Sequence, residues 1–274
     1  MKSKIWFFNY NIKQSSSTHL PVHWLQFKRF YEENGKFPDQ YDWIEPVINY
    51  DNLAIDDIVQ EAISHKSDIY MFSSYTWSWR IVNIVASSIR DELPDAVIVL
   101  GGPHQYTTYS DQVTWFKNHP YFDATCCALD YGEFFLLDML DQFALGNINW
   151  STVRNSYSRL GLGPKGDIKS FIYPYDVFSS NENYLDRIVN EIKSQNKNVH
   201  ISYETNRGCM YKCAYCEWGG GTNTKLIIKS LDNIKKDIEF LQKYEIDVVW
   251  VTDANFGILD RDVDIVNMFT KYSN

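Results

Sequence analysis

Three cysteines, Cys209, Cys213 and Cys216, stand close together in the second half of this chain in the spacing C-x-x-x-C-x-x-C. Three thiolates can hold three irons of a cubane iron–sulfur cluster, whereas a cluster used only for electron transfer has four cysteine ligands. The fourth iron is then open to a ligand from outside the protein, as the open position of a catalytic zinc is. The spacing therefore predicts a cluster that binds a further molecule.

The segment before the cysteines predicts where they lie in the fold. Residues 199–205 (V-H-I-S-Y-E-T) alternate apolar and polar side chains, as a half-buried strand does. Gly208 follows, and glycine permits the tight turn that leads into a loop. The cysteines are therefore expected on a loop at the carboxyl end of a strand, where α/β folds place their chemistry.

This segment resembles the cluster loop of radical S-adenosylmethionine (SAM) enzymes, whose pattern is C-x-x-x-C-x-aromatic-C, with Tyr215 as the aromatic residue. Residues 216–225 (C-E-W-G-G-G-T-N-T-K) and 253–262 (D-A-N-F-G-I-L-D-R-D) are similar to the cobalamin-dependent branch of that family. The resemblance implies a 4Fe–4S cluster on the three cysteines, with SAM on the open iron and Tyr215 beside its adenine. It also implies that Asp253 and Asn255 bind the amino group of SAM. A carboxylate oxygen and an amide oxygen can each accept hydrogen bonds from that group.

A zinc site is the alternative for the cysteines. The three thiolates and one histidine, such as His200, would make a Cys₃His site. Zinc ligands usually come as two separated pairs, and this spacing does not have that form. Disulfides are not expected, because five cysteines are an odd number and no secretory signal precedes them. A reducing, cytoplasmic location is the simpler prediction.

The amino-acid composition limits the classes of partner that this chain is expected to bind. The chain has 274 residues, a net charge of −9 and 45% hydrophobic residues, which is enough for one large domain or two ordinary ones. The acidic balance argues against a nucleic-acid surface, which is usually basic. No apolar run approaches the length that spans a bilayer. The apolar run near the N-terminus is too short for a signal peptide and is expected to be a first strand.

The N-terminal half alternates predicted strands and helices. The strands are expected at residues 68–73, 96–100 and 122–128. Such alternation predicts a parallel sheet with right-handed crossovers, and ligands bind these sheets outside the carboxyl ends of the strands. The loops expected at that edge are residues 73–77, 101–106 and 130–133.

The order of these parts is similar to the cobalamin-binding domain of the same branch. G-G-P-H at residues 101–104 and G-E at 132–133 precede the cysteine loop, although the family often has G-E-G-E at the second site. The resemblance implies corrin contacts from Gly101, Gly102, His104, Gly132 and Glu133.

The motif D-x-H-x-x-G does not occur in the sequence, which implies cobalamin without a histidine below the cobalt. Tyr75, Thr76 or Trp77 would then cover the lower face of the corrin. On the residues alone, the two glycines only end a strand and begin a turn. A binding or interaction module whose Rossmann-like fold is only a scaffold is therefore the alternative.

The predicted architecture is α/β, with a Rossmann-like parallel-sheet cobalamin-binding domain at 1–145 and a linker region at 146–195. The first strand–helix units of a radical SAM partial TIM-like barrel are expected at 196–274. Ser230 is expected to be a helix N-cap. The family barrel has about six units, against eight in the full barrel, and this chain holds about two. We therefore expect either a fragment or a subunit whose barrel another chain completes, with little turnover by the chain alone.

The resemblance implies an enzyme that cleaves SAM to a 5′-deoxyadenosyl radical and methylates an unactivated carbon of a small-molecule or peptide substrate. Cyclisation and rearrangement also occur in the branch. A reductant protein is the expected partner, and neither nucleic acid nor a membrane is expected. The alternative is a non-catalytic fragment or subunit that binds an iron–sulfur cluster or cobalamin.

Overall fold

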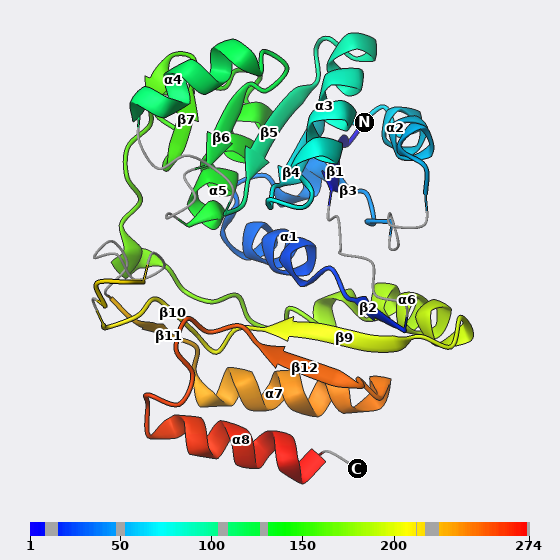
Figure 1. Cartoon of the computed structure of the whole chain (residues 1–274), viewed down its shortest axis with the longest axis vertical. Helices are drawn as coiled ribbons and strands as arrows, with labels where there is room; N and C mark the ends of the chain where they lie inside the picture. The colour runs from blue at the N-terminus through cyan, green and yellow to red at the C-terminus, as the bar shows by residue number, and fades with distance from the viewer. Residues whose placement is uncertain are drawn as a thin grey trace. The chain divides into compact units, whose positions relative to one another are not determined.

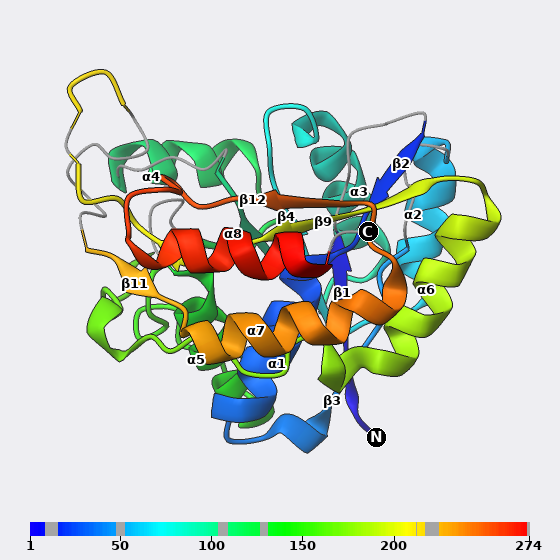
Figure 2. The same ribbon diagram turned by 90° about the horizontal axis from the view of Figure 1, so that it is seen from below.

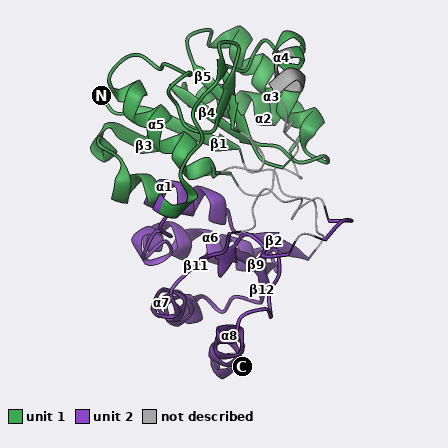
Figure 3. Cartoon of the chain, turned by 90° about the vertical axis from the view of Figure 1, so that its left-hand side faces the viewer, with its two compact units in different colours: residues 1–13, 30–169 green, residues 14–29, 170–274 purple. Residues whose placement is uncertain are grey.

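The computed structural model describes residues 1–8, 16–47, 53–103, 109–126, 131–211, 213–216 and 225–272, with only the backbone of 109–113. The chain divides into two compact units, residues 1–13 with 30–169 and residues 14–29 with 170–274, called unit 1 and unit 2 below (Figure 3). Within the described ranges, no helix is both long enough and apolar enough to cross a bilayer.

Unit 1 contains a seven-stranded sheet in the order β3-β1-β4-β5-β6-β7-β8 (Figure 1). Its strands are β1 (Ser3–Phe8), β3 (Tyr41–Trp43), β4 (Ile69–Ser73), β5 (Val97–Gly101), β6 (Ala124–Cys126), β7 (Ser156–Ser158) and β8 (Gly161–Leu162). The first five strands pair in parallel, and β7 pairs antiparallel with both β6 and β8. The chain places β3 on one side of β1 and β4 on the other, so the strand order reverses between β1 and β4. In open α/β sheets, ligands usually bind in the crevice outside the carboxyl ends of the strands, at the point where the strand order reverses.

Helices cover this sheet because each carries an apolar stripe. The helices are α2 (Ile55–Ser64), α3 (Trp79–Glu92), α4 (Tyr109–Asn118) and α5 (Gly132–Ala144), and a short 3₁₀ helix η1 lies at Pro38–Gln40. In α3 the buried residues recur at helical spacing, at Val82, Val85, Ala86 and Ile89. They join a core of strand aromatics that includes Trp6, Phe8, Tyr70 and Phe72. The predicted α/β fold with a mostly parallel sheet is confirmed.

Three strands of this sheet were not predicted, namely β3, β7 and β8. Residues 156–162 were expected in the linker region, but they form β7 and β8 and extend the sheet beyond β6. Thr125 of β6 pairs with Tyr157, and Ser156 and Ser158 are buried. The segment has no apolar alternation, so only its pairing with a strand about thirty residues earlier, a nonlocal event, makes it a strand.

Unit 2 contains a three-stranded parallel sheet in the order β12-β9-β2. Its strands are β2 (Ser17–His19), β9 (Asn198–Tyr203) and β12 (Val248–Val251), and a separate antiparallel pair is formed by β10 (Asn206–Arg207) and β11 (Ile227–Ile228). Strand β2 was not predicted, because residues 11–50 carry no clear period. Whether further strands extend this sheet into a partial barrel stays a prediction.

The helices α6 (Glu182–Ser194), α7 (Leu231–Leu241) and α8 (Arg261–Tyr272) belong to unit 2, and α7 and α8 run side by side (Figure 2). Helix α1 (Val22–Asn34) precedes β3, and short 3₁₀ helices η3, η4 and η5 lie at Ile168–Ser170, Ser179–Asn181 and Gln242–Tyr244. Helix α7 begins at the predicted N-cap, because the Oγ of Ser230 accepts a hydrogen bond from the backbone N–H of Asn233 at 3.2 Å.

Candidate functional site

The three predicted thiol ligands lie in one loop of unit 2 that follows β9 and β10. Cys209 and Cys216 are half-buried, Cys213 is exposed, and none of the three is in a disulfide. Gly208 has a φ of 96°, in the left-handed region that glycine adopts without strain, as the turn prediction required. The N–H of Cys216 donates to the carbonyl of Cys213 at 3.0 Å, which makes a turn between the last two ligands.

The three thiols do not surround a common metal position. In the part of the chain that the structure describes, no three side chains of His, Cys, Asp and Glu are arranged to hold one metal ion. His200, the histidine of the zinc alternative, lies in a ring contact with His19 at 5.1 Å and accepts a hydrogen bond from Trp250 Nε1 at 3.4 Å. The donor chemistry of three thiols on one loop nevertheless fits an iron–sulfur cluster, which is held by cysteine thiolates.

Tyr215, the predicted adenine neighbour, is 92% exposed, more than Tyr211, the other aromatic residue that the structure describes in the loop, at 49%. The charge of Cys213, followed by a hydrogen bond between the two side chains, raises the pKa of Tyr215. The phenol therefore lies directly beside one predicted ligand, with its ring surface accessible to a planar molecule.

The chain that enters the cysteine loop is bound to the chain that leaves it. Strands β10 and β11 pair in the register Asn206 to Ile228, and the N–H of Lys229 donates to the carbonyl of Thr205 at 3.0 Å. The segment that enters the cysteine loop and the segment that leaves it are therefore held together, so the base of the loop is closed.

Asp253 and Asn255 follow β12, as predicted, and both are half-buried. The carboxylate of Asp253 points to the base of the cysteine loop, where it accepts hydrogen bonds from Thr205 and Asn206. Burial raises the pKa of Asp253, and these hydrogen bonds act against the increase. Asn255 lies two residues further on, in the turn that precedes α8. A contact of either residue with SAM stays a prediction.

Sequence reasoning missed a cluster around Arg207, the residue before Gly208. Its guanidinium donates to Glu204 Oε2 from Nε at 3.0 Å and from Nη2 at 2.8 Å, and lies 4.8 Å from the ring centroid of Phe171. The hydroxyl of Tyr173 donates to the same carboxylate at 3.2 Å. An arginine next to a cysteine loop was a visible signal, but its aromatic partners lie in the segment that was expected to be a linker.

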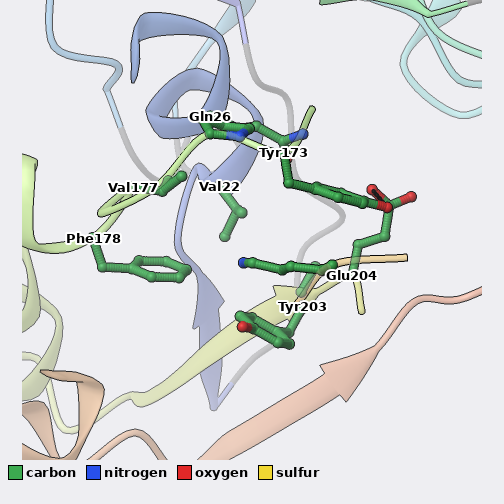
Figure 4. Close-up of a pocket in the computed structure, with 10 residues that line it drawn as sticks. Val22, Gln26, Tyr173, Val177, Phe178, Tyr203 and Glu204 are labelled. Atoms are coloured by element: carbon green, nitrogen blue, oxygen red, sulfur yellow. Dashed lines mark hydrogen bonds between the residues drawn. The ribbon is translucent and has the colours of Figure 1, made fainter. Parts of the chain in front are cut away.

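A small pocket lies at the carboxyl end of β9 (Figure 4). Val22 and Gln26 of α1 line it together with Tyr173, Val177, Phe178, Tyr203 and Glu204. The cavity encloses about 20 Å³, which is room for about one water molecule. It is too small for SAM or a corrin, so the pocket belongs to the packing around β9.

In unit 1 the predicted loop at 73–77 meets the described start of the loop at 101–106, at the carboxyl edge of β4 and β5. Tyr75 is half-buried and stacks on the exposed ring of Trp77, with centroids 4.7 Å apart and planes 13° apart. Burial raises the pKa of Tyr75. Thr76, between them, is exposed. This pair presents an aromatic surface next to the reversal of strand order.

The two predicted glycines pack against the same loop. The N–H of Ser74 donates to the carbonyl of Gly101 at 2.8 Å. Gly102 has a φ of 95°, and a Cβ there would lie 2.5 Å from the carbonyl oxygen of Ser74, so a side chain does not fit. Gly102 is therefore needed for the backbone itself, whether or not a ligand binds. His104 lies outside the described residues.

Gly132 is the first residue of α5, and Glu133 follows it with 2% exposure. The backbone carbonyl of the preceding Tyr131 accepts a hydrogen bond from Asn155 Nδ2 at 3.0 Å, which ties the start of α5 to the segment before β7. A direct contact of the Glu133 carboxylate with a corrin would require the buried side chain to become exposed.

Two curated relatives match nearly all of this chain. The 2-(S-pantetheinyl)-carbapenam-3-carboxylate methyltransferase of Streptantibioticus cattleyicolor is 27% identical over 93% of the chain, and the cobalamin-dependent radical SAM methyltransferase TokK of Streptomyces tokunonensis is 26% identical over 92%. The chain spans only 37% and 36% of their respective lengths. No protein-family model matches the sequence.

Solved structures share the fold. The apo cobalamin-dependent S-adenosylmethionine radical enzyme OxsB superposes with a TM-score of 0.67 at 14% identity, over 99% of this chain and 37% of that one. The radical SAM methyltransferase TsrM of Kitasatospora setae, with cobalamin and a [4Fe–4S] cluster bound, gives 0.65 at 13% identity, over 99% and 51%. The resemblance predicted from the cysteine loop is confirmed by these relatives.

Proposed function

We propose, on the premise that this chain is a homologue of cobalamin-dependent radical SAM methyltransferases, that it supplies the cobalamin- and cluster-binding parts of an enzyme that methylates an unactivated carbon. The observation that carries the proposal is the cysteine loop. Three thiols in the spacing C-x-x-x-C-x-x-C stand on one loop with a closed base, beyond the carboxyl end of a parallel strand.

In unit 2 the residues Cys209, Cys213 and Cys216 would hold a 4Fe–4S cluster. When bound, that cluster supplies the electron that cleaves SAM to methionine and a 5′-deoxyadenosyl radical. The exposed ring of Tyr215 would stack on the adenine, since aromatic faces pair in an offset arrangement. The amide oxygen of Asn255 would accept a hydrogen bond from the ammonium of SAM. The sequence predicts the same role for Asp253, whose carboxylate accepts hydrogen bonds from Thr205 and Asn206 in this structure.

In unit 1 cobalamin would lie outside the carboxyl ends of β4 and β5, beside the reversal of strand order. Bound cobalamin supplies the methyl group that is transferred. Tyr75, Thr76 and the stacked Trp77 would cover its lower face, because the sequence has no D-x-H-x-x-G histidine for that position. Backbone at Gly101 and Gly102, and at Gly132 and Glu133, would border the corrin together with His104.

The substrate and the reductant protein are proposals for the whole enzyme. A small molecule is the favoured substrate class, because one relative is named for a carbapenam carboxylate. A reducing cytoplasm fits a cluster held by three free thiols.

Anaerobic reconstitution of the chain with iron and sulfide tests the cluster. We expect about four irons per chain in the unmodified protein, as the cluster type requires, and loss of cluster in Cys213→Ala. Cys126→Ala is the matched control, because Cys126 is buried in β6 of the other unit and should leave iron uptake unchanged. Tight zinc binding without iron uptake would favour the zinc alternative.

Titration with hydroxocobalamin, followed by absorbance, tests unit 1 in the same protein. A spectral change that saturates supports a cobalamin site, whereas an unchanged spectrum favours a Rossmann-like scaffold without a cofactor. Mass spectrometry of products formed from methyl-deuterated SAM by the whole enzyme then tests methylation, because an unlabelled product would exclude methyl transfer from SAM.

A further inference from the structure

The carboxylate of Asp253 has no acceptor capacity left. Its Oδ1 accepts from the backbone N–H groups of Thr205 at 2.6 Å and Asn206 at 3.1 Å. Its Oδ2 accepts from Asn206 Nδ2 at 2.7 Å and from the hydroxyl of Thr205. A carboxylate has about four lone-pair sites, so every site is taken by the two residues that enter the cysteine loop.

Arg261, the first residue of α8, also binds the base of the cysteine loop. Its Nη2 donates to the backbone carbonyl of Thr205 at 2.7 Å, and its Nη1 donates to the backbone carbonyl of Lys229. One carbonyl lies before the cysteine loop and the other after it. The guanidinium therefore links the entrance of the loop to its exit, next to the β10–β11 pair.

Buried side chains make these contacts specific. Thr205 and Asn206 are 0% exposed, so their polar groups cannot exchange these hydrogen bonds for water. Loss of the Asp253 carboxylate would leave two backbone donors and two side-chain donors buried without that acceptor. The entrance to the cysteine loop would then have to rearrange.

We propose that Asp253 and Arg261 are positioning residues that fix the base of the cysteine loop, and that Asp253 acts on the cluster through Thr205 and Asn206 rather than by contact with SAM. This inference rests on the proposed function of the loop as the cluster site. Three ligands on one loop must be ordered together when they bind, and a fixed base lowers that conformational cost. The ammonium of SAM would then be bound by Asn255 and by acceptors other than Asp253.

Asp253→Ala in the full chain tests the inference, with Asp247→Ala as the matched control. Asp247 stands at the other end of β12, where its Oδ2 accepts from the N–H of Val199 in β9 at 2.7 Å. Both variants remove a carboxylate that stands beside one end of β12 and accepts a backbone N–H, but only Asp253 contacts the residues that lead into the cysteine loop. A general loss of sheet stability should therefore affect both variants, whereas a loss of positioning should affect only one.

Two measurements are compared. Hydrogen exchange of the cluster-free chain should become about tenfold faster at the backbone N–H groups of Thr205 and Asn206 in Asp253→Ala, because their acceptor is lost, and should stay unchanged there in Asp247→Ala. After reconstitution, Asp253→Ala should retain less than half the iron of the unmodified chain, and the electron paramagnetic resonance spectrum of its reduced cluster should change. Asp253→Asn, which keeps two acceptor positions, should recover part of both properties, and it serves if the alanine variant does not fold.

The outcomes separate this inference from the proposed function. An unmodified chain that binds no cluster refutes the proposed function, and the inference with it. The second outcome begins with a normal cluster in the unmodified chain. If both Asp253 variants then keep the same hydrogen exchange, iron content and spectrum but show no spectral response to SAM, Asp253 is a direct SAM ligand. That result overturns the inference. Equal losses in the Asp253 and Asp247 variants also overturn it, because they indicate sheet stability alone.

Discussion

Lys229 and Asp237 form a buried ion pair at the exit of the cysteine loop, and we predict that breaking it strongly destabilises unit 2. Their side chains are 7% and 3% exposed, and the Lys229 Nζ contacts Asp237 Oδ2 directly. The hydroxyl of Tyr203 donates to the same oxygen at 2.7 Å, and the Lys229 Nζ lies 4.6 Å from the centroid of the Tyr203 ring. The pair thus joins β9, β11 and α7.

Lys229→Met removes the cation and leaves the carboxylate of Asp237 buried with the Tyr203 hydroxyl. Removal of one partner of a buried ion pair costs about 3–5 kcal/mol of unfolding free energy, because an uncompensated charge stays in the interior. With a urea m-value of about 2 kcal/mol/M, the midpoint of unfolding should fall by about 2 M. The double variant Lys229→Met with Asp237→Asn should recover more than half of that loss, because it removes the buried charge.

Urea unfolding should be followed by hydrogen exchange of peptides from β9 and α7, because the two units need not unfold together. Lys236→Met is the matched control, since Lys236 pairs with Asp232 on the exposed face of the same helix. We expect no measurable change there, as for most surface pairs. If Lys229→Met unfolds at the same urea concentration as Lys236→Met, the buried pair does not stabilise unit 2 and the reasoning is wrong.

Further predictions concern unit 1, pH and turnover. Gly102→Ala should lower the unfolding free energy of unit 1, measured by thermal unfolding, by at least about 1–3 kcal/mol. Gly101→Ala should be tolerated, because its Cβ would meet nothing closer than 3.9 Å. Equal effects of the two substitutions would contradict the conformational argument. Burial, and secondarily the charge of His200, lowers the pKa of His19, so the unfolded chain binds more protons below about pH 6.5 and unit 2 should lose stability as the pH falls from there. His19→Gln should weaken that dependence in unfolding measured at pH 7.5 and 5.5, and an unchanged slope would refute the assignment. The reconstituted chain with SAM and a strong reductant should form little 5′-deoxyadenosine, and multiple turnovers would show that it is catalytically sufficient.

The local sequence determined the parts of this protein that depend on neighbouring residues. The cysteine spacing, the glycine turn before it and the aromatic Tyr215 predicted the resemblance to cobalamin-dependent radical SAM enzymes, and the relatives confirm that resemblance. Apolar strands that alternate with amphipathic helices predicted the mostly parallel sheet of unit 1. The N-cap at Ser230 was readable because the side-chain oxygen and the backbone N–H of Asn233 that donates to it lie three residues apart.

Tertiary structure alone decided the contacts between segments that are far apart in the chain. Strand β2 pairs with β9 about 180 residues later, and Asp253 accepts its hydrogen bonds from Thr205 and Asn206, nearly 50 residues earlier. The sequence placed Asp253 correctly at the end of a strand, but it could not show which donors lie there. A carboxylate can bind an incoming ammonium or a buried backbone N–H equally well, and the choice depends on which group the fold brings within about 3 Å of it.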